Sequence, residues 1–463
     1  PYMKPFFELN PEIARKEIIS TWEHLIEKGG WLTMAFNRHA YHSVKYTEND
    51  WLNTNNGYVE PDLTKGYSPN MSTSISFFST ECDLLNFACD LYKNTTDQKE
   101  KDRIRTWIMR MKKSFWVCSD PNTQFYCYQN TSAGMPSLGE EYAAPNTKDP
   151  NEIYPNWWEM SQLPSGVTNA TYGDRFYNQY AEDIIDQGYV EDTIENRTKI
   201  MECCTKFNYA PEGKVPFSDW YCAETLGLDT QEGAQIWQRA MRALGNVVKY
   251  GYDEDKNQLH NMLADGTRIT GLVSNRPGYY GNAGKVFTSS TPGPGTVLPY
   301  AFAYAKSLTI PISARSETYD EDLANIYKLV RGGMKGLGCG EIGVEFLGDR
   351  EDINYTSTQI KYTAILAVLH LYEASGNTEF LDLARNMANK MINALMIDGM
   401  FALPDKTNAR YLYLYGESSQ YAWILAYLEA LILGEDVSKF YFQPYEGYYE
   451  DYGWYGDNEI HMN

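Results

Sequence analysis

The side chains best suited to chemistry lie in residues 275–280, which read NRPGYY, and at His260, which precedes them in the chain. A guanidinium and an amide are strong hydrogen-bond donors to a carboxylate. A phenol or an imidazole can transfer a proton when a neighbouring cation tunes its pKa. These residue types therefore fit proton transfer on an acidic substrate.

This combination matches the needs of β-elimination on a polymer of uronic acids. The C6 carboxylate must be neutralised so that the C5 proton becomes acidic, a base must take that proton, and an acid must protonate the leaving oxygen. We predict that Tyr280 or Tyr279 serves as base and acid. Arg276 and His260 are predicted to support that step, and Asn275 to bind the substrate.

Further basic and aromatic side chains precede predicted helices. In a ring of helix hairpins, the loops that lead into the inner helices gather at one end and build a cleft. One arginine in such a loop usually pairs with a nearby carboxylate, but the set together favours a basic, aromatic cup for an acidic polysaccharide. The other predicted substrate-binding residues are Arg38, His39, His42, Tyr355, Lys361, Arg410 and Tyr411.

Metal dependence stays open. His39 and His42 are three positions apart and could bind a divalent cation if a carboxylate such as Glu81 joined them. A pair of histidines is a weak metal signal, and a structural role for at least one is the simpler interpretation. No organic cofactor is expected, because no glycine-rich phosphate loop has the required spacing.

Two other functions compete with a lyase. A glycoside hydrolase would use two facing carboxylates, although acidic runs are usually solvated surface. The candidates are Asp253, Glu254, Asp255, Asp349, Asp352 and Glu417. A non-catalytic glycan-binding protein would explain the 38 Tyr and 11 Trp residues, since aromatic rings stack on sugars. It would not explain the basic side chains.

The charge and hydropathy exclude several classes of partner. The net charge is −21, which disfavours nucleic acid. No stretch approaches eighteen uncharged apolar residues, so no membrane span is expected. The expected partner is an acidic polysaccharide, and the expected state is a monomer.

Eight cysteines are present and none forms a CxxC pair, which argues against a zinc site. The even count permits disulfides, with Cys118 and Cys127 the most plausible pair by proximity in sequence. In a chain of this length, isolated buried thiols are an equally good interpretation. The sequons and the absence of an N-terminal Met fit a secreted or periplasmic product.

Helical periodicity dominates the chain outside residues 119–225, where Gly, Pro, Asn and aromatic residues are frequent. That region is predicted to be a loop-rich insertion, interrupted by a helical stretch near 173–207. The other predicted helices are 12–28, 74–93, 98–117, 230–249, 294–308, 319–335, 357–375, 378–396 and 417–434.

Residues 357–396 give the clearest repeating unit. The first helix is apolar nearly all round and the second is amphipathic, with a reversal at Ser375-Gly376-Asn377 and Thr378 as a possible cap. A buried helix followed by an outer one is the unit of a closed ring. The sequence therefore predicts an all-α protein, an (α/α) toroid forming one domain over residues 1–463.

The stretch YDEDKNQLHNMLADGTRITG, followed by NRPGYYG, resembles bacterial proteins described as pectate-lyase-like. The helices of residues 357–434 resemble the hairpins of (α/α)-toroid carbohydrate enzymes. That group includes polysaccharide lyases of the pectate, alginate and glucuronan types, unsaturated glucuronyl hydrolases and sugar 2-epimerases. The resemblance covers about residues 230–434 and implies a lyase acting on one of these polymers.

Overall fold

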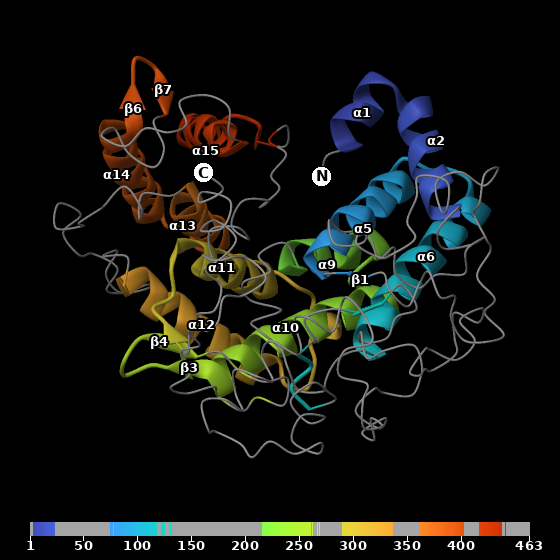
Figure 1. The fold of residues 1–463 in the computed structure, drawn as a ribbon, viewed down its shortest axis with the longest axis horizontal. Helices are drawn as coiled ribbons and strands as arrows, with labels where there is room; N and C mark the ends of the chain where they lie inside the picture. The colour runs from blue at the N-terminus through green and yellow to red at the C-terminus, as the bar shows by residue number, and fades with distance from the viewer. Residues whose placement is uncertain are drawn as a thin grey trace. The chain divides into compact units, whose positions relative to one another are not determined.

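The computed structural model describes residues 3–23, 75–76, 78–117, 122–125, 130–131, 215–260, 262, 266, 268, 289–336, 362–401, 416–437 and 440. Helices account for most of these residues, and the strands are short (Figure 1). The prediction of an all-α protein is confirmed.

The helices alternate with short connections over much of the described chain. Their bounds are α1 Met3–Leu9, α2 Pro11–Trp22, α5 Phe78–Lys93, α6 Gln98–Val117, α9 Val215–Leu226, α10 Gln231–Gly251, α11 Pro294–Leu308, α12 Tyr319–Gly336, α13 Tyr362–Ser375, α14 Thr378–Leu395 and α15 Gly416–Leu433. The short strands pair in three antiparallel groups: β1 Ile75–Ser76 with β2 Asn130–Thr131; β3 Tyr252–Asp253, β4 Gln258–His260 and β5 Ser289–Ser290; and β6 Met396–Ile397 with β7 Met400–Phe401.

The described residues fall into two compact units. The first unit holds α1, α2, α5 and α6 together with residues 218–239. The second unit holds residues 215–217 and 240–260 and everything described from residue 289 onward. The prediction of a single domain stays a prediction.

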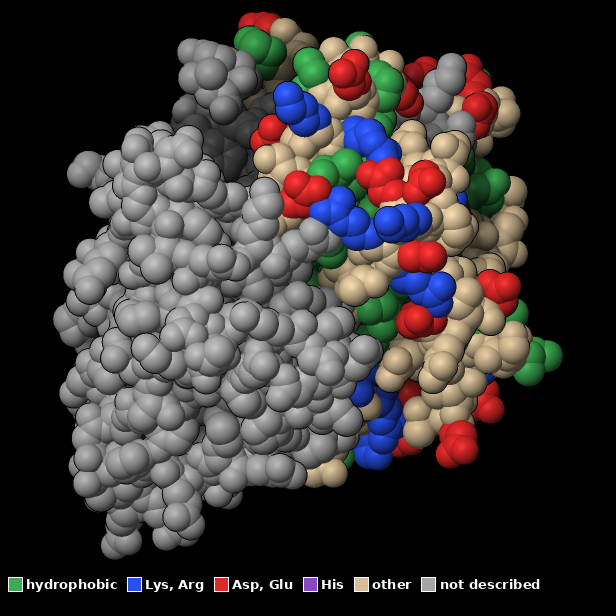
Figure 2. Space-filling model, turned by 90° about the vertical axis from the view of Figure 1, so that its right-hand side faces the viewer, with side chains coloured by type: hydrophobic (Ala, Val, Ile, Leu, Met, Phe, Trp, Pro, Cys, Tyr) green, Lys and Arg blue, Asp and Glu red, His purple; other side chains and the backbone are tan. Residues whose placement is uncertain are grey.

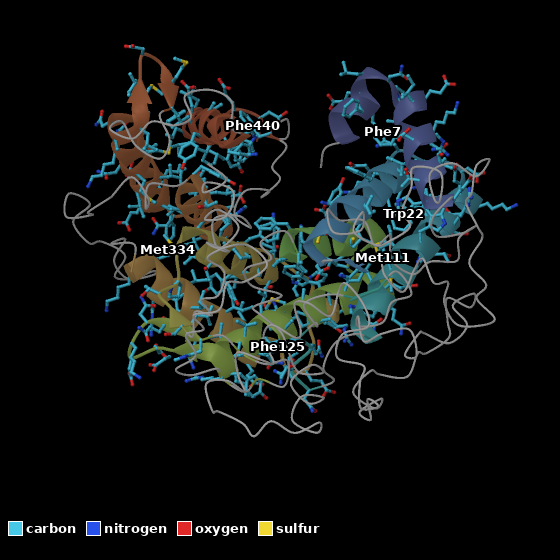
Figure 3. The ribbon with its side chains drawn as sticks, viewed as in Figure 1. Phe7, Trp22, Met111, Phe125, Met334 and Phe440 are labelled. Carbon is cyan, nitrogen blue, oxygen red and sulfur yellow. The ribbon has the colours of Figure 1, made fainter. Side chains whose placement is uncertain are left out.

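Aromatic stacking fastens α2 to α6 in the first unit. The rings of Trp22 (labelled in Figure 3) and Trp107 are nearly parallel with centroids 5.6 Å apart. The Arg103 guanidinium lies 4.9 Å from the Trp107 ring. Arg103 also forms an ion pair with Glu23 at 2.5 Å. Burial of Trp22, which is 1% exposed, anchors the N-terminal helices to this unit.

Helix α9 is a difference from the sequence prediction. It occupies residues that were predicted to belong to the loop-rich insertion. Glu224 is the one residue of α9 that falls in the exposed class, so the helix lacks the alternation of buried and exposed faces that marks an amphipathic helix. The predicted helical stretch near 173–207 lies outside the described residues.

In the second unit, α11 and α12 form an antiparallel hairpin. The Tyr319 hydroxyl, at the start of α12, donates to the Ser307 carbonyl near the end of α11 at 2.8 Å. At the other end of the hairpin, Gly333 lies so close to Val297 that an added Cβ would come within 2.2 Å of its side chain. Glycine at position 333 therefore permits the two helices to pack closely.

Helices α13 and α15 run parallel to each other. Tyr362 at the start of α13 meets Tyr421 near the start of α15, with ring centroids 5.7 Å apart. Glu373 near the end of α13 accepts a hydrogen bond from Tyr427, six residues further along α15. Contacts that advance together along both helices require a parallel arrangement.

Helix α11 is parallel to α13 by the same argument. Phe302 contacts the His370 ring edge-on at 5.1 Å, and one turn later the Lys306 ammonium acts electrostatically on Glu373. Helices α11 and α13 are mostly buried, whereas α14 is buried along one face. The predicted alternation of inner and outer helices is therefore present in this unit (Figure 1).

Two turns follow from their residue types. Gly376 has φ +67° between α13 and α14, as the predicted reversal requires. The cap of α14 is Asn377, whose side chain accepts from the Glu379 amide at 3.1 Å, so the prediction of Thr378 as the cap is wrong. Asp398 and Gly399 both have positive φ, which allows the two-residue hairpin between β6 and β7.

Within the described residues, no helix combines the length and the apolar character needed to cross a membrane.

Candidate active site

The N-termini of α11, α13 and α15 lie at one end of the second unit, because these three helices are parallel. Helix N-termini carry partial positive charge and unpaired amide groups, which favour anions. The chain segments 337–361 and 402–415 lead directly into α13 and α15. This end of the unit is therefore the candidate active site.

Aromatic side chains pack beneath this end. Tyr362 and Tyr421 are 0% and 1% exposed, and Phe401 of β7 lies 5.2 Å from the Tyr421 ring. Tyr300 on α11 is also fully buried, and burial raises its pKa well above the usual value. A phenol with a raised pKa keeps its proton at neutral pH, so Tyr300 is not a proton acceptor there.

The segment with the predicted catalytic residues is tied at its two ends. His260 is the last residue of β4 and pairs with Ser289 of β5, which leads into α11. Antiparallel partners lie about 5 Å apart, so the residues that flank segment 261–288 are neighbours in space. His260 is half-buried at this pair.

His260 is the one predicted site residue that the structure describes. The others lie outside the described residues, and their predicted roles stay predictions. They are Tyr279, Tyr280, Arg276, Asn275, Arg38, His39, His42, Tyr355, Lys361, Arg410 and Tyr411.

A polar network that the sequence analysis did not predict joins the later turns of the inner helices. Glu373 accepts hydrogen bonds from the Tyr427 hydroxyl and from His370 Nδ1, the latter at 3.2 Å. Trp423 stacks on Tyr427 with centroids 5.1 Å apart, and Phe440 packs against both (Figure 3). His370 is 7% exposed, as expected for a packing residue.

The electrostatics of this network assign it a structural role. Burial opposes ionisation of Glu373, but His370, Tyr427 and Lys306 overcome it and lower its pKa to about 2. Burial, followed by the Glu373 charge, raises the Tyr427 pKa well above its usual value. Tyr427 therefore keeps its proton at neutral pH and holds α15 against α13.

Replacing Glu373 with glutamine is expected to destabilise the protein at neutral pH and not at acid pH. The folded-state pKa of Glu373 is about 2 and the ordinary value is 4.5. A lowered pKa stabilises the folded state above the ordinary value, and this contribution disappears as pH falls from about 4.5 to about 2. Denaturant unfolding of wild type and Glu373→Gln at several pH values measures the difference.

The exposed Glu429 on α15 supplies the control, since Glu429→Gln removes the same charge from the neighbouring helix. The difference in unfolding free energy between wild type and Glu373→Gln should decrease as the pH falls. The difference between wild type and Glu429→Gln should stay small at every pH. A gap for Glu373→Gln that does not change with pH would contradict the assignment.

The described face in Figure 2 is not a basic cup. Figure 2 shows one face of the molecule, where Lys and Arg side chains are interspersed with Asp and Glu side chains. Arg15 pairs with Glu100 and Arg105 pairs with Glu232, as expected for ordinary surface arginines. The residues predicted to form the basic cup lie in other segments of the chain, outside the described residues.

Comparison with known sequences decides the family. Residues 1–438 match the family described as periplasmic pectate lyase. The chain belongs to this family. The match extends N-terminally beyond the resemblance predicted for residues 230–434, and it confirms the predicted relationship to pectate-lyase-like proteins.

A curated relative points the same way. The chain is 21% identical over 417 residues to a pectate disaccharide-lyase of Dickeya dadantii (strain 3937). This alignment covers 87% of the chain and 60% of the relative, so the chain spans less than two thirds of that protein's length. The family's description as periplasmic agrees with the predicted location outside the cytoplasm.

The carboxylates proposed for a hydrolase behave as surface residues where the structure describes them. Asp253 pairs with Lys256 at 3.2 Å, and Glu254 pairs with Arg331. Both carboxylates lie at the exposed β3–β4 hairpin, and Asp255 between them is exposed. The structure therefore does not support the hypothesis that Asp253, Glu254 and Asp255 are the catalytic carboxylates of a hydrolase.

No metal site can be assigned from the described residues. Among them, no group of three or more His, Cys, Asp and Glu side chains is placed to hold a metal ion. His39 and His42 lie outside these ranges, so the hypothesis of a divalent cation at these histidines stays a prediction.

Proposed function

We propose that the protein is a polysaccharide lyase that cleaves pectate by β-elimination. The observation that carries this proposal is the match of residues 1–438 to the periplasmic pectate lyase family. The name of the Dickeya dadantii relative, a pectate disaccharide-lyase, supports the same polymer. Alginate and glucuronan, the other candidates from the sequence, have no comparable support.

The arrangement of the second unit fits an acidic polymer. The parallel helices α11, α13 and α15 direct the positive ends of their dipoles to one end of the unit. Segments that lead into two of them carry Tyr355, Lys361, Arg410 and Tyr411. Local positive charge offsets the overall charge of −21 and allows a polyanion to approach.

The proposed reaction assigns one task to each predicted catalytic group. Arg276, with Asn275, neutralises the C6 carboxylate and so acidifies the C5 proton. Tyr280 or Tyr279 takes that proton when a cation lowers its pKa, and a phenol then protonates the leaving oxygen. The product carries a carbon–carbon double bond conjugated with the carboxylate.

The test is ultraviolet absorbance during incubation with polygalacturonate, alginate and glucuronan. Polygalacturonate is expected to give rising absorbance from the conjugated double bond, and the other two polymers little or none. New reducing ends without this absorbance would identify a hydrolase. Turnover of alginate or glucuronan in preference to polygalacturonate would overturn the substrate assignment while leaving a lyase.

The same assay after treatment with a chelator tests the cation. Loss of activity that returns with a divalent cation would support ligands such as His39 and His42. Unchanged activity would indicate that side chains alone neutralise the substrate carboxylate.

A further inference from the structure

Helices α5 and α9 meet along a buried seam in the first unit. The Ser218 hydroxyl of α9 donates to the Cys82 carbonyl of α5 at 3.4 Å, and further along both helices Lys93 pairs with Glu224 at 3.3 Å. Contacts that advance together show that these segments are parallel. The seam therefore holds residues of α5 and α9 in a fixed register.

Two thiols face each other within this seam. The sulfur atoms of Cys89 and Cys222 are 3.6 Å apart, and both residues are 0% exposed. A disulfide bond is about 2.05 Å long, so the two sulfur atoms lie about 1.5 Å further apart than a bond requires. The sequence placed these cysteines 133 positions apart, and the fold brings them into contact.

We propose that Cys89 and Cys222 form a structural disulfide bond in the mature protein. Each thiol loses one proton and one electron as the sulfur–sulfur bond forms. The oxidant is a disulfide, either of a thiol–disulfide oxidoreductase or of oxidised glutathione, and it takes up two electrons and two protons to become two thiols. Compartments outside the cytoplasm supply such oxidants, in keeping with the periplasmic family.

The environment of the pair fixes when the bond forms. The hydrogen bond with Cys89, followed by burial, raises the pKa of Cys222 well above its usual value. The thiolate is the reactive form, so the buried Cys222 thiol exchanges slowly in the folded protein. Oxidation therefore occurs while the chain folds, and the finished bond resists reductants until the protein opens.

The bond would brace the segment between α6 and α9. The closed loop runs from residue 89 to residue 222 and includes most of the predicted insertion at 119–225. A cross-link stabilises by limiting the conformations of the unfolded chain, and this effect grows with loop length. The proposed disulfide would therefore restrict the unfolded chain over the residues whose sequence is least typical of helix.

Peptide mapping tests the proposal directly on the wild-type protein. The protein is secreted to the periplasm of the expression host, unfolded in denaturant without reductant, alkylated and digested. The expected result is one linked species that joins the peptides of Cys89 and Cys222 and separates on reduction. Alkylation of both cysteines before reduction would overturn the proposal.

Thermal unfolding gives a second measurement. Wild type that has been reduced in denaturant and refolded under reducing conditions is expected to melt roughly 5 °C or more below the oxidised protein. Cys82→Ala, on the same helix and equally buried, should keep this redox dependence. Cys222→Ala should lose it, and an undiminished redox shift in Cys222→Ala would contradict the assignment.

Discussion

Arg276→Ala is expected to lower kcat/KM on polygalacturonate by about 10²–10³-fold, the usual cost of removing one preorganised donor to a developing anion. Arg276 is proposed to hold the C6 carboxylate while the C5 proton leaves, and this interaction strengthens as charge develops. The loss should therefore appear in kcat as well as in KM. Arg276→Lys should recover part of the activity, since it keeps the charge but not the two-pronged guanidinium.

Arg268→Ala is the matched control for this change. It lies in the same stretch of chain between β4 and β5, is exposed, and carries the same charge. A general attraction between the protein and an acidic polymer would weaken equally in both variants. Equal activity of Arg276→Ala and Arg268→Ala, with both proteins folded, would remove Arg276 from the reaction.

Most helix positions could be predicted from local sequence patterns. The predicted helix 294–308 matches α11 at both ends, and 98–117 matches α6. Both helices have clear start signals in the sequence. Proline lies in the first turn of α11, and a short polar linker precedes α6. Periodicity predicts such elements because each one buries a continuous face or stripe.

Contacts between distant residues could not be predicted in the same way. The Glu373–Tyr427 hydrogen bond joins residues 54 positions apart, and neither residue type is unusual in its helix. Cysteine pairing shows the same limit. Sequence proximity favoured Cys118 and Cys127, which lie outside the described residues, whereas the fold brings Cys89 to Cys222.

The candidate site was predictable as chemistry but not as geometry. Residue types at 275–280 indicated carboxylate binding and proton transfer before any fold was known. Which side chain meets which carbon depends on angstrom-scale placement, and a one-dimensional pattern does not contain this information. The parallel order of α11, α13 and α15 supplies part of the missing geometry, because it brings their N-termini to one end.

Breaking the buried ion pair of Lys112 and Asp219 is expected to cost about 3–5 kcal/mol of unfolding free energy. The Lys112 ammonium on α6 donates to the Asp219 carboxylate on α9, and the two side chains are 2% and 3% exposed. Asp219→Ala leaves an ammonium buried without its counter-charge, and Lys112→Met leaves a buried carboxylate. Denaturant unfolding, followed by tryptophan fluorescence, measures both losses.

The double variant Lys112→Met/Asp219→Leu distinguishes the effect of leaving one buried charge unpaired from the effect of changing the side chains at these two core positions. Two apolar side chains of similar volume bury neither charge, so the double variant should be more stable than either single variant. The pair of Lys93 on α5 and Glu224 on α9 joins α9 to a different helix through water-accessible side chains, and Lys93→Met should cost less than about 1 kcal/mol. Additive losses of stability in the double variant would show that Lys112 and Asp219 do not stabilise each other. The interpretation of the contact between α6 and α9 as a buried, mutually neutralising ion pair would then be wrong.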